Sequence, residues 1–209
     1  MNKKKFGIIG KPLAHSLSPY LHTHWFKKYK LSAEYLTIEI DENDIGKVIN
    51  DVRKGTFSGL NVTLPYKQKV IQHLDILINE AKETNSVNTI YLNNAGQVVG
   101  DNTDVFGLQA GYLKEINSSN KKALILGAGG VSPSVIFALI KSNFSQIFLT
   151  NRTFEKSVFL KKKFPIINLI KWEDFLGEVK NFDLIINATS LGLKNNKDFD
   201  NQFENPKES

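Results

Sequence analysis

A run of 18 uncharged residues between Lys122 and Lys141, ALILGAGGVSPSVIFALI, constrains the fold more than any other segment of the chain. Its length is that of a membrane span. Its middle, GAGGVSP, carries three glycines and a proline, which would break a helix exposed to lipid. The run is therefore predicted to form a buried strand at residues 123–126, a tight turn, and a buried helix at residues 131–142.

The turn has the form G-x-G-x-x-S, with Ser132 where the dinucleotide-binding fingerprint carries glycine or alanine. Gly127 permits the sharp turn, and Gly129 lets the backbone approach a diphosphate. The N-terminus of the following helix presents unpaired N–H groups and a partial positive charge to the anion. Because the motif follows a strand and opens a helix, we predict a dinucleotide site; the alternative is a tight turn without a ligand.

The next strand, predicted at residues 146–150, ends at a feature that discriminates between the two nicotinamide cofactors. An NAD site places Asp or Glu about 20 residues after the glycines, where it binds the ribose 2′-hydroxyl. This chain has Asn151, Arg152 and Thr153 there, with Lys156 one helical turn further on. Arg152 can bind a 2′-phosphate through two N–H groups, so the segment predicts NADP rather than NAD. The alternative is a basic helix start at the surface, which opposes the helix dipole.

Strands and helices alternate along the chain, which predicts an α/β fold with parallel strands and helices on both faces. Further strands are predicted at residues 5–9, 33–40, 60–64, 87–92, 166–170 and 183–187. Further helices are predicted at residues 18–30, 42–54, 67–83, 105–116, 154–164 and 172–176. The character of the chain changes near Asp104, and from Lys194 onward it is too polar to contribute much core.

Composition excludes several classes of function. The chain has no cysteine, so disulfides, thiolate zinc sites, iron–sulfur clusters and a cysteine nucleophile are ruled out. The net charge is +6, but only Arg53 and Arg152 of the 27 basic residues are arginine, which argues against a dedicated nucleic-acid binder. The apolar stretch at residues 6–10 is too short for a signal peptide. We expect a cytoplasmic protein with no membrane and no nucleic-acid partner.

Three polar clusters in the first half are candidates for a binding site. The first is SLSP, in which Ser18 either caps a helix or binds a ligand and Ser16 is free to do so. The second is NVTLPYK, where Asn61 and Thr63 alternate on one face of a strand and Lys67 lies just beyond it. In open parallel sheets, ligands bind at such carboxyl ends. The alternative for Lys67 is an exposed lysine at a helix start.

The third cluster comprises residues 85–89, NSVNT, and residues 100–104, GDNTD. Asp104 is either a catalytic carboxylate or the N-cap of the helix predicted at residues 105–116. His22 and His24 are separated by one residue, so on a helix they point to different sides. We expect no metal site.

Seven motifs in order, SLSP, NVTLPYK, SVNT, GDNTD, GAGG, NRT and NATSLG, resemble the shikimate dehydrogenase family over residues 6–192. The resemblance implies reversible NADPH-dependent reduction of 3-dehydroshikimate to shikimate. It also implies an open α/β substrate-binding domain at residues 1–104, followed by a Rossmann-type NADP-binding domain at residues 105–209. The expected partner is the small-molecule substrate, and the protein is expected to be a monomer or a homodimer.

The resemblance also implies roles for single residues. Ser16 and Ser18 match the residues that bind the substrate carboxylate. The residues around the ring hydroxyls are matched by Thr63, Lys67, Asn88 and Asp104, with Lys67 and Asp104 as the catalytic pair, and the strand pattern adds Asn61. The cofactor-binding residues are matched by Gly127, Ala128, Gly129, Gly130, Val131, Asn151, Arg152, Thr153, Lys156, Thr189, Ser190 and Leu191. A lysine ammonium is a suitable proton donor to the alkoxide that hydride addition leaves.

The chain departs from the family pattern after Gly192. Family members continue with further strands, a substrate-contacting tyrosine and a last helix that supplies a glutamine, so the resemblance implies a nucleotide domain that is incomplete at its C-terminus. An NAD-dependent quinate/shikimate dehydrogenase is the alternative enzyme, and Arg152 argues against it. A non-catalytic nucleotide- or metabolite-binding remnant is the alternative from another class.

Overall fold

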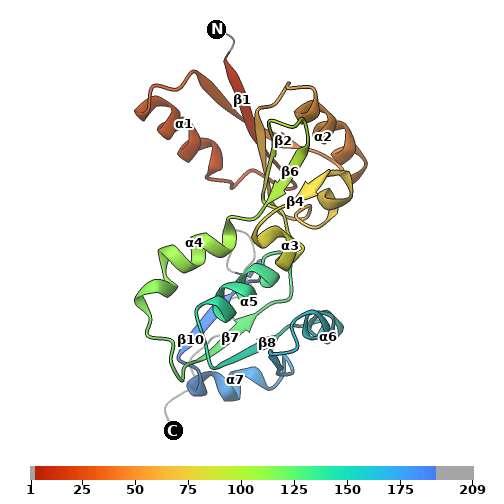
Figure 1. Ribbon diagram of the computed structural model, residues 1–209. Helices are drawn as coiled ribbons and strands as arrows, with labels where there is room; N and C mark the ends of the chain where they lie inside the picture. The colour runs from red at the N-terminus through yellow and green to blue at the C-terminus, as the bar shows by residue number, and fades with distance from the viewer. Residues whose placement is uncertain (1–2, 192–209) are drawn as a thin grey trace. The chain divides into compact units, whose positions relative to one another are not determined.

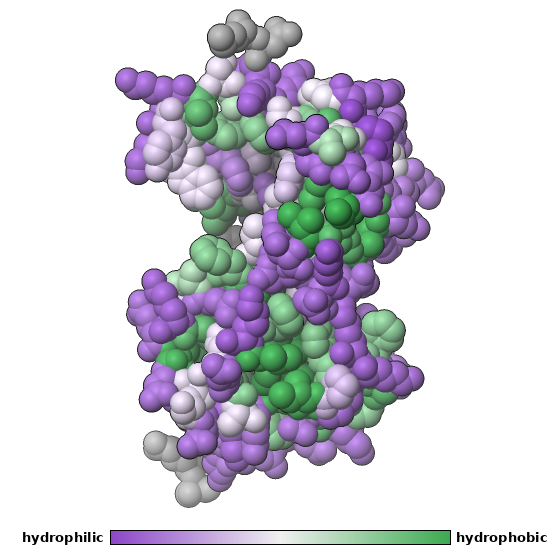
Figure 2. Space-filling model, in the orientation of Figure 1, coloured by the Kyte–Doolittle hydropathy of each residue, from purple (hydrophilic) through white to green (hydrophobic). Residues whose placement is uncertain are grey.

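The computed structural model describes residues 3–191 (Figure 1). The chain divides into two compact units, Met1–Gly111 and Tyr112–Ser209, which are described separately. Polar and charged side chains cover much of the visible surface of both units, interrupted by apolar patches (Figure 2). No helix in the described part of the chain is both long enough and apolar enough to cross a membrane.

The first unit is built on a six-stranded sheet with the order β2-β1-β3-β5-β6-β4. Its strands are β1 (Lys4–Gly10), β2 (Ala33–Glu39), β3 (Gly59–Val62), β4 (Ile76–Leu77), β5 (Thr89–Leu92) and β6 (Val98–Asp101). Its α-helices are α1 (Ser18–Lys28), α2 (Ile45–Arg53), α3 (Glu80–Thr84) and α4 (Asp104–Gly111). Strand β1 pairs in parallel with β2 and β3, and β4 pairs in parallel with β6.

The predicted parallel pairing holds for β1 with β2 and β3 and for β4 with β6, but β5 runs antiparallel to both β3 and β6, so this sheet is mixed. Strands β5 and β6 form a hairpin, and a short turn connects only antiparallel neighbours. The side chain of Asn93 closes this turn by accepting hydrogen bonds from the N–H groups of Ala95 (3.0 Å) and Gln97 (2.9 Å). Strand β6 was not predicted from the sequence, since it is only four residues long and contains a glycine.

The prediction of a helix at residues 67–83 is wrong. The segment instead forms a short 3-10 helix at Lys69–His73, then β4, then α3. Asp75 N donates to Val98 O and Ile78 N donates to Gly100 O, each at 3.0 Å. The N–H groups of this segment are therefore hydrogen-bonded to strand β6 and not to carbonyl groups of a preceding helical turn. Pairing with a distant strand therefore overrides the local helical pattern.

The two faces of the sheet bury different side chains, as expected from alternation along β1. Ile9 packs with the apolar side of α2, whose buried residues are Ile45, Val48, Ile49 and Val52. Ile8 packs with Tyr35 of β2 on the other face, where Phe26 of α1 joins them. The two helices lie on opposite sides of the sheet in Figure 1.

The second unit contains a four-stranded parallel sheet with the order β10-β7-β8-β9. Its strands are β7 (Lys122–Leu126), β8 (Gln146–Thr150), β9 (Asn168–Leu169) and β10 (Leu184–Asn187), and its α-helices are α5 (Ser132–Lys141), α6 (Phe154–Lys163) and α7 (Phe175–Glu178). The uncharged run forms β7, the glycine turn and α5, which confirms the prediction of a buried strand, a turn and a buried helix.

Candidate active site and nucleotide-binding loops

The predicted catalytic residues lie together at the edge of the first sheet where β3 and β6 end and β5 begins. Asn61 on β3 pairs with Thr89 at the start of β5, and Thr89 pairs with Asp101 at the end of β6. The carboxyl ends of β3 and β6 therefore lie beside the start of β5. The residues that continue from these strands, among them Thr63 and Asn88, meet at this edge, which is the usual place for a ligand site in an open sheet.

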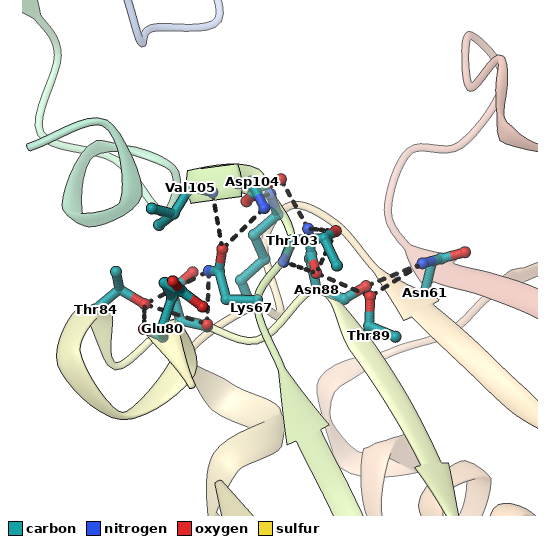
Figure 3. A network of polar contacts seen from close by, with 11 residues as sticks. Asn61, Lys67, Glu80, Thr84, Asn88, Thr89, Thr103, Asp104 and Val105 are labelled. Carbon is teal, nitrogen blue, oxygen red and sulfur yellow. Dashed lines mark hydrogen bonds and ion pairs between the residues drawn. The ribbon is translucent and has the colours of Figure 1, made fainter. Parts of the chain in front are cut away.

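Lys67 and Asp104 form an ion pair at this edge, with Nζ 2.8 Å from Oδ2 (Figure 3). Their side chains are only 15% and 25% exposed. The other carboxylate oxygen, Oδ1, accepts a hydrogen bond of 2.8 Å from Asn88 Nδ2. Lys67 is thus a paired, partly buried cation, and the alternative of an exposed lysine at a helix start does not describe it.

Asn88 holds the pair in place through both ends of its amide. Its Nδ2 also donates to Thr103 Oγ1 (3.0 Å), and its Oδ1 accepts from the N–H of Thr103 (3.0 Å) and from the hydroxyl of Thr89 (2.9 Å). The side chain is only 9% exposed. These four bonds use both donors and both acceptor sites of the amide and fix its orientation, so a substrate hydroxyl that binds Asn88 must replace one of them.

Asn102 is a functional neighbour that the sequence reasoning missed. Its Oδ1 accepts from the N–H of Asp104 (2.9 Å) and Val105 (3.4 Å), so Asn102, not Asp104, caps α4. Its Nδ2 donates to Ser86 O (2.8 Å) and Thr84 Oγ1 (3.5 Å), and the residue is only 2% exposed. The carboxylate of Asp104 is thereby left for Lys67. The available signal was the preference for asparagine just before a helix.

The two serines of SLSP follow β1 and precede the body of α1. Ser18 is the first residue of the helix, with Leu17 in the cap position and no side-chain cap, so the prediction of Ser18 as N-cap is wrong. Ser16 Oγ instead accepts from Ser18 N at 3.3 Å. Both serines are half-buried. The Ser16 oxygen thus accepts from the N–H of the first helical residue, and the O–H groups of both serines can still donate to a ligand.

Asn61 lies near the end of β3, and Thr63 follows the last residue of this strand. Asn61 Oδ1 accepts a 2.6 Å hydrogen bond from the hydroxyl of Tyr35, and Asn61 Nδ2 lies 3.2 Å from Asn88 O. Burial raises the pKa of Tyr35 to about 12, so its hydroxyl stays protonated as a donor. A Cβ on Gly10 would come within 2.5 Å of the Thr63 methyl group, which explains why β1 ends in a glycine beside Thr63.

The glycine turn of the second unit begins in a conformation that suits only glycine. Gly127 has a φ of +106°, and a Cβ there would lie 2.7 Å from Thr189 Cγ2. A Cβ on Gly129 would come no nearer than 3.8 Å to a neighbouring atom, so its backbone is open to a ligand. Ser132, buried in α5, donates its hydroxyl to Gly127 O at 2.8 Å. The serine therefore braces the turn.

Asn151 connects this turn to the basic loop after β8. Its Oδ1 accepts from the N–H of Ala128 (3.0 Å), and its Nδ2 donates to Thr153 O (2.8 Å). The N–H of Ala128 is therefore committed within the protein rather than to a phosphate. Arg152 and Lys156 are exposed to solvent on this loop and on the first turn of α6.

The segment after β10 is held in the same manner. Asn187 Oδ1 accepts from Thr189 N (3.0 Å) and Thr189 Oγ1 (2.6 Å), and Asn187 Nδ2 donates to Leu191 O (3.0 Å). Ser190, between them, is exposed. Gly192 and the polar tail considered in the sequence lie outside the described residues. Among residues 3–191, no group of three His, Asp or Glu side chains is arranged to hold a metal ion.

Comparison with known proteins agrees with this arrangement. The model of the shikimate dehydrogenase substrate binding domain matches residues 8–90, and that of shikimate / quinate 5-dehydrogenase matches residues 111–196. A shikimate dehydrogenase (NADP(+)) from Pelagibacter ubique is 50% identical over 193 residues, which cover 92% of this chain and 71% of that protein. The chain belongs to the shikimate dehydrogenase family.

Solved structures of this family superpose well on the chain. The crystal structure of shikimate dehydrogenase from Aquifex aeolicus has a TM-score of 0.84 at 36% identity and covers 92% of this chain and 71% of that one. The enzyme from Thermus thermophilus, in complex with NADP(H) and shikimate, has a TM-score of 0.78 at 32% identity and covers 91% and 70%. The family resemblance and the α/β fold predicted from the sequence are confirmed.

Proposed function

We propose that this chain catalyses the reversible NADPH-dependent reduction of 3-dehydroshikimate to shikimate, a step in aromatic amino-acid biosynthesis. The observation that carries the proposal is the ion pair of Lys67 and Asp104, 2.8 Å apart at a polar sheet edge. Relatives from Pelagibacter ubique and Pyrococcus abyssi carry the name shikimate dehydrogenase (NADP(+)). The same observations disfavour a non-catalytic remnant, since binding alone requires no such pair.

In this proposal Lys67 is the general acid and base. NADPH, when bound, supplies the hydride to the substrate carbon. The Lys67 ammonium donates a proton to the carbonyl oxygen as it becomes a hydroxyl, and accepts it back in the reverse direction. Asp104 holds the ammonium by its Oδ2 and accepts a hydrogen bond from a neighbouring substrate hydroxyl. Asn88, bonded to Oδ1, keeps the carboxylate oriented.

The remaining polar residues of the first unit would bind the substrate. Ser16 and Ser18 supply hydroxyl donors to its carboxylate, while Asn61, Thr63 and Asn88 bind its ring hydroxyls. A polyol requires such a set, because each hydroxyl buried without a partner loses its hydrogen bonds to water. Residues 1–104 form the substrate-binding domain in this proposal.

The second unit would bind NADP, within the proposed domain at residues 105–209. The open backbone around Gly129 suits a diphosphate, and the exposed Arg152 and Lys156 suit the 2′-phosphate. Around these lie the other proposed cofactor contacts, Gly127, Ala128, Gly130, Val131, Asn151, Thr153, Thr189, Ser190 and Leu191. Ala128 contributes by its position in the turn, since its N–H already bonds Asn151. It stays a prediction that the protein is a monomer or a homodimer, that it is cytoplasmic and that it has no nucleic-acid partner.

The function is tested with purified protein, shikimate and NADP, by following the absorbance of NADPH. Turnover with shikimate and NADP, and much weaker turnover with quinate or NAD, is the expected result. Shikimate and NADP binding in calorimetry without any turnover would favour the remnant instead.

The cofactor assignment is tested with Arg152→Ala. Loss of a bidentate contact to a phosphate is expected to raise the KM for NADP by about 10- to 100-fold while that for NAD changes little. Lys162→Ala is the matched control, because it removes the same charge from an exposed position on α6. Equal losses with NADP and NAD would refute the 2′-phosphate contact.

A further inference from the structure

A buried tyrosine lies behind the proposed substrate residues and contacts two of them. Tyr35 of β2 is only 8% exposed, and its hydroxyl donates to Asn61 Oδ1 at 2.6 Å. Ser18 of α1 lies beside the same tyrosine and lowers its pKa, against the larger upward effect of burial. The tyrosine hydroxyl on β2 therefore bonds Asn61 of β3 and lies beside the first residue of α1.

His22 holds this tyrosine from the other side. It lies one helical turn after Ser18 on α1, and its ring stacks on the ring of Tyr35 with centroids 4.2 Å apart and planes 14° apart. Its Nδ1 lies 2.9 Å from Ser18 O, an acceptor, so Nδ1 carries the proton. His22 thus contacts both the Tyr35 ring and Ser18 O, and it couples the position of α1 to the tyrosine ring.

Dense packing does not hold the Asn61 amide by itself. A partly open pocket of about 250 Å³ adjoins it, and its lining includes the aromatic residues Phe6, His22, Phe26, Tyr35 and Tyr91 together with residues of β3 and β5. The contacts of Asn61 Nδ2 are long, at 3.2 Å to Asn88 O and 3.5 Å to Thr89 Oγ1. The bond from Tyr35 is the shortest that Asn61 makes, so the orientation of this amide depends chiefly on the tyrosine hydroxyl.

We propose that Tyr35 is a positioning residue for the substrate: its hydroxyl fixes Asn61 relative to Ser18. It thereby sets the spacing between the group that binds the substrate carboxylate and the group that binds a ring hydroxyl. This inference rests on the proposed function, because it takes Ser18 and Asn61 as substrate contacts. Tyr35 acts through these two side chains and touches no reacting atom.

The test is Tyr35→Phe, which keeps the ring that stacks on His22 and removes only the hydroxyl. Asn61 Oδ1 then loses its donor while half-buried, and the expected result is a rise of about tenfold in the Kd and KM for shikimate. The kcat is expected to change less than about threefold and the Kd for NADP not at all, since neither Lys67 nor the second unit is touched. An unchanged shikimate Kd in a folded variant would overturn the proposal.

Tyr66→Phe is the matched control. Tyr66 is also buried, at 3% exposure, and also donates a 2.6 Å hydrogen bond, but to Ile40 O in the core on the α2 face. It should lower the melting temperature as Tyr35→Phe does without the selective rise in the Kd for shikimate. If both variants raise that Kd equally, the effect is a general loss of stability and the positioning role is refuted.

A double-mutant cycle separates positioning from packing. If Tyr35 acts through Asn61, Tyr35→Phe should add almost nothing to the shikimate Kd in an Asn61→Ala background. Full additivity would overturn the proposal. Should Tyr35→Phe fail to fold, the cycle of Ser18→Ala with Asn61→Ala tests the same link with the tyrosine intact. If the effects of these two substitutions on the shikimate binding free energy are strictly additive, the proposal is overturned.

The positioning role and the proposed function are tested by different measurements, shikimate binding for the first and NADP reduction for the second. Wild-type protein that binds shikimate but does not reduce NADP would refute the catalytic proposal alone, because the Tyr35 test is read from shikimate binding. Turnover in the wild type together with an unchanged shikimate Kd in Tyr35→Phe would refute the positioning role alone.

Discussion

Replacing Lys67 by methionine removes the proposed proton donor and keeps the aliphatic stem of the side chain. A positioned general acid contributes about 10²- to 10⁴-fold to the rate, so kcat for shikimate oxidation should fall by that factor. The Kd for NADP should not change, because the ion pair lies wholly within the first unit. Steady-state turnover and calorimetry on the same preparation measure the two quantities.

The expected cost in stability is small and can be worked from the contacts. The substitution leaves the Asp104 carboxylate without its cation, but Asn88 Nδ2 still donates to it at 2.8 Å and the side chain is 25% exposed. A pair with this access to water is worth far less than the 3–5 kcal/mol of a fully buried one, so the free energy of unfolding should fall by about 1 kcal/mol. Loss of activity would then reflect chemistry rather than unfolding.

Lys69→Met is the control for the change itself. Lys69 lies two residues further on and pairs with Glu42, and these side chains are 41% and 57% exposed. Exposed pairs contribute about 0–1 kcal/mol, so this variant should keep both its stability and its turnover. A Lys67→Met enzyme that retains kcat within about tenfold of the wild type would refute the general-acid role.

Three further perturbations test the framework around the sites. Asn102→Ala removes the α4 cap and the bond to Ser86 O, and should lower the free energy of unfolding by about 2–4 kcal/mol in urea denaturation. Gly127→Ala brings a methyl group within 2.7 Å of Thr189 Cγ2 at a φ of +106°, and should abolish NADP binding in calorimetry. The hydrogen bond from Arg53 holds the pKa of Asp75 below the ordinary value for an aspartate, so the stability that this bond adds is present above about pH 4 and is lost as the pH falls further. In Asp75→Asn, the free energy of unfolding should therefore fall less steeply as the pH is lowered below about 4.

Each of these has a contrary outcome. An Asn102→Ala protein as stable as the wild type would mean that α4 needs no cap. NADP binding by Gly127→Ala at wild-type affinity would show that the turn tolerates a side chain at this φ. An acid limb unchanged in Asp75→Asn would mean that other carboxylates control acid unfolding.

Local patterns predicted the second unit better than the first. Strand β7 and helix α5 are buried in the middle of their unit, so nearly every side chain had to be apolar and the glycine turn between them was conspicuous. The segment at residues 67–83 carries a helical pattern as well, yet β4 pairs with β6, a strand that is later in the chain. No local pattern contains that information.

The catalytic pair was predicted from motifs, but its supports were not. Lys67 and Asp104 are residue types with recognisable chemistry, whereas Asn102 and Tyr35 are types that more often serve turns and cores. What distinguishes Asn102 and Tyr35 here is their contacts: Asn102 donates to Ser86 O, and Tyr35 on β2 reaches Asn61 on β3 across strand β1. Such contacts depend on strand order and become visible only in the fold.

Asparagine recurs at the loops that carry the proposed sites, and its chemistry explains the choice. Asn88, Asn102, Asn151 and Asn187 each use Oδ1 to accept from a backbone N–H and Nδ2 to donate within the same region. A serine lacks this reach, and an aspartate lacks the donor. An aspartate would also add negative charge beside sites proposed for a carboxylate and for phosphates, and at Asn102 it would set a carboxylate oxygen against Ser86 O. A neutral amide is therefore the side chain that can brace these loops without repelling the ligands.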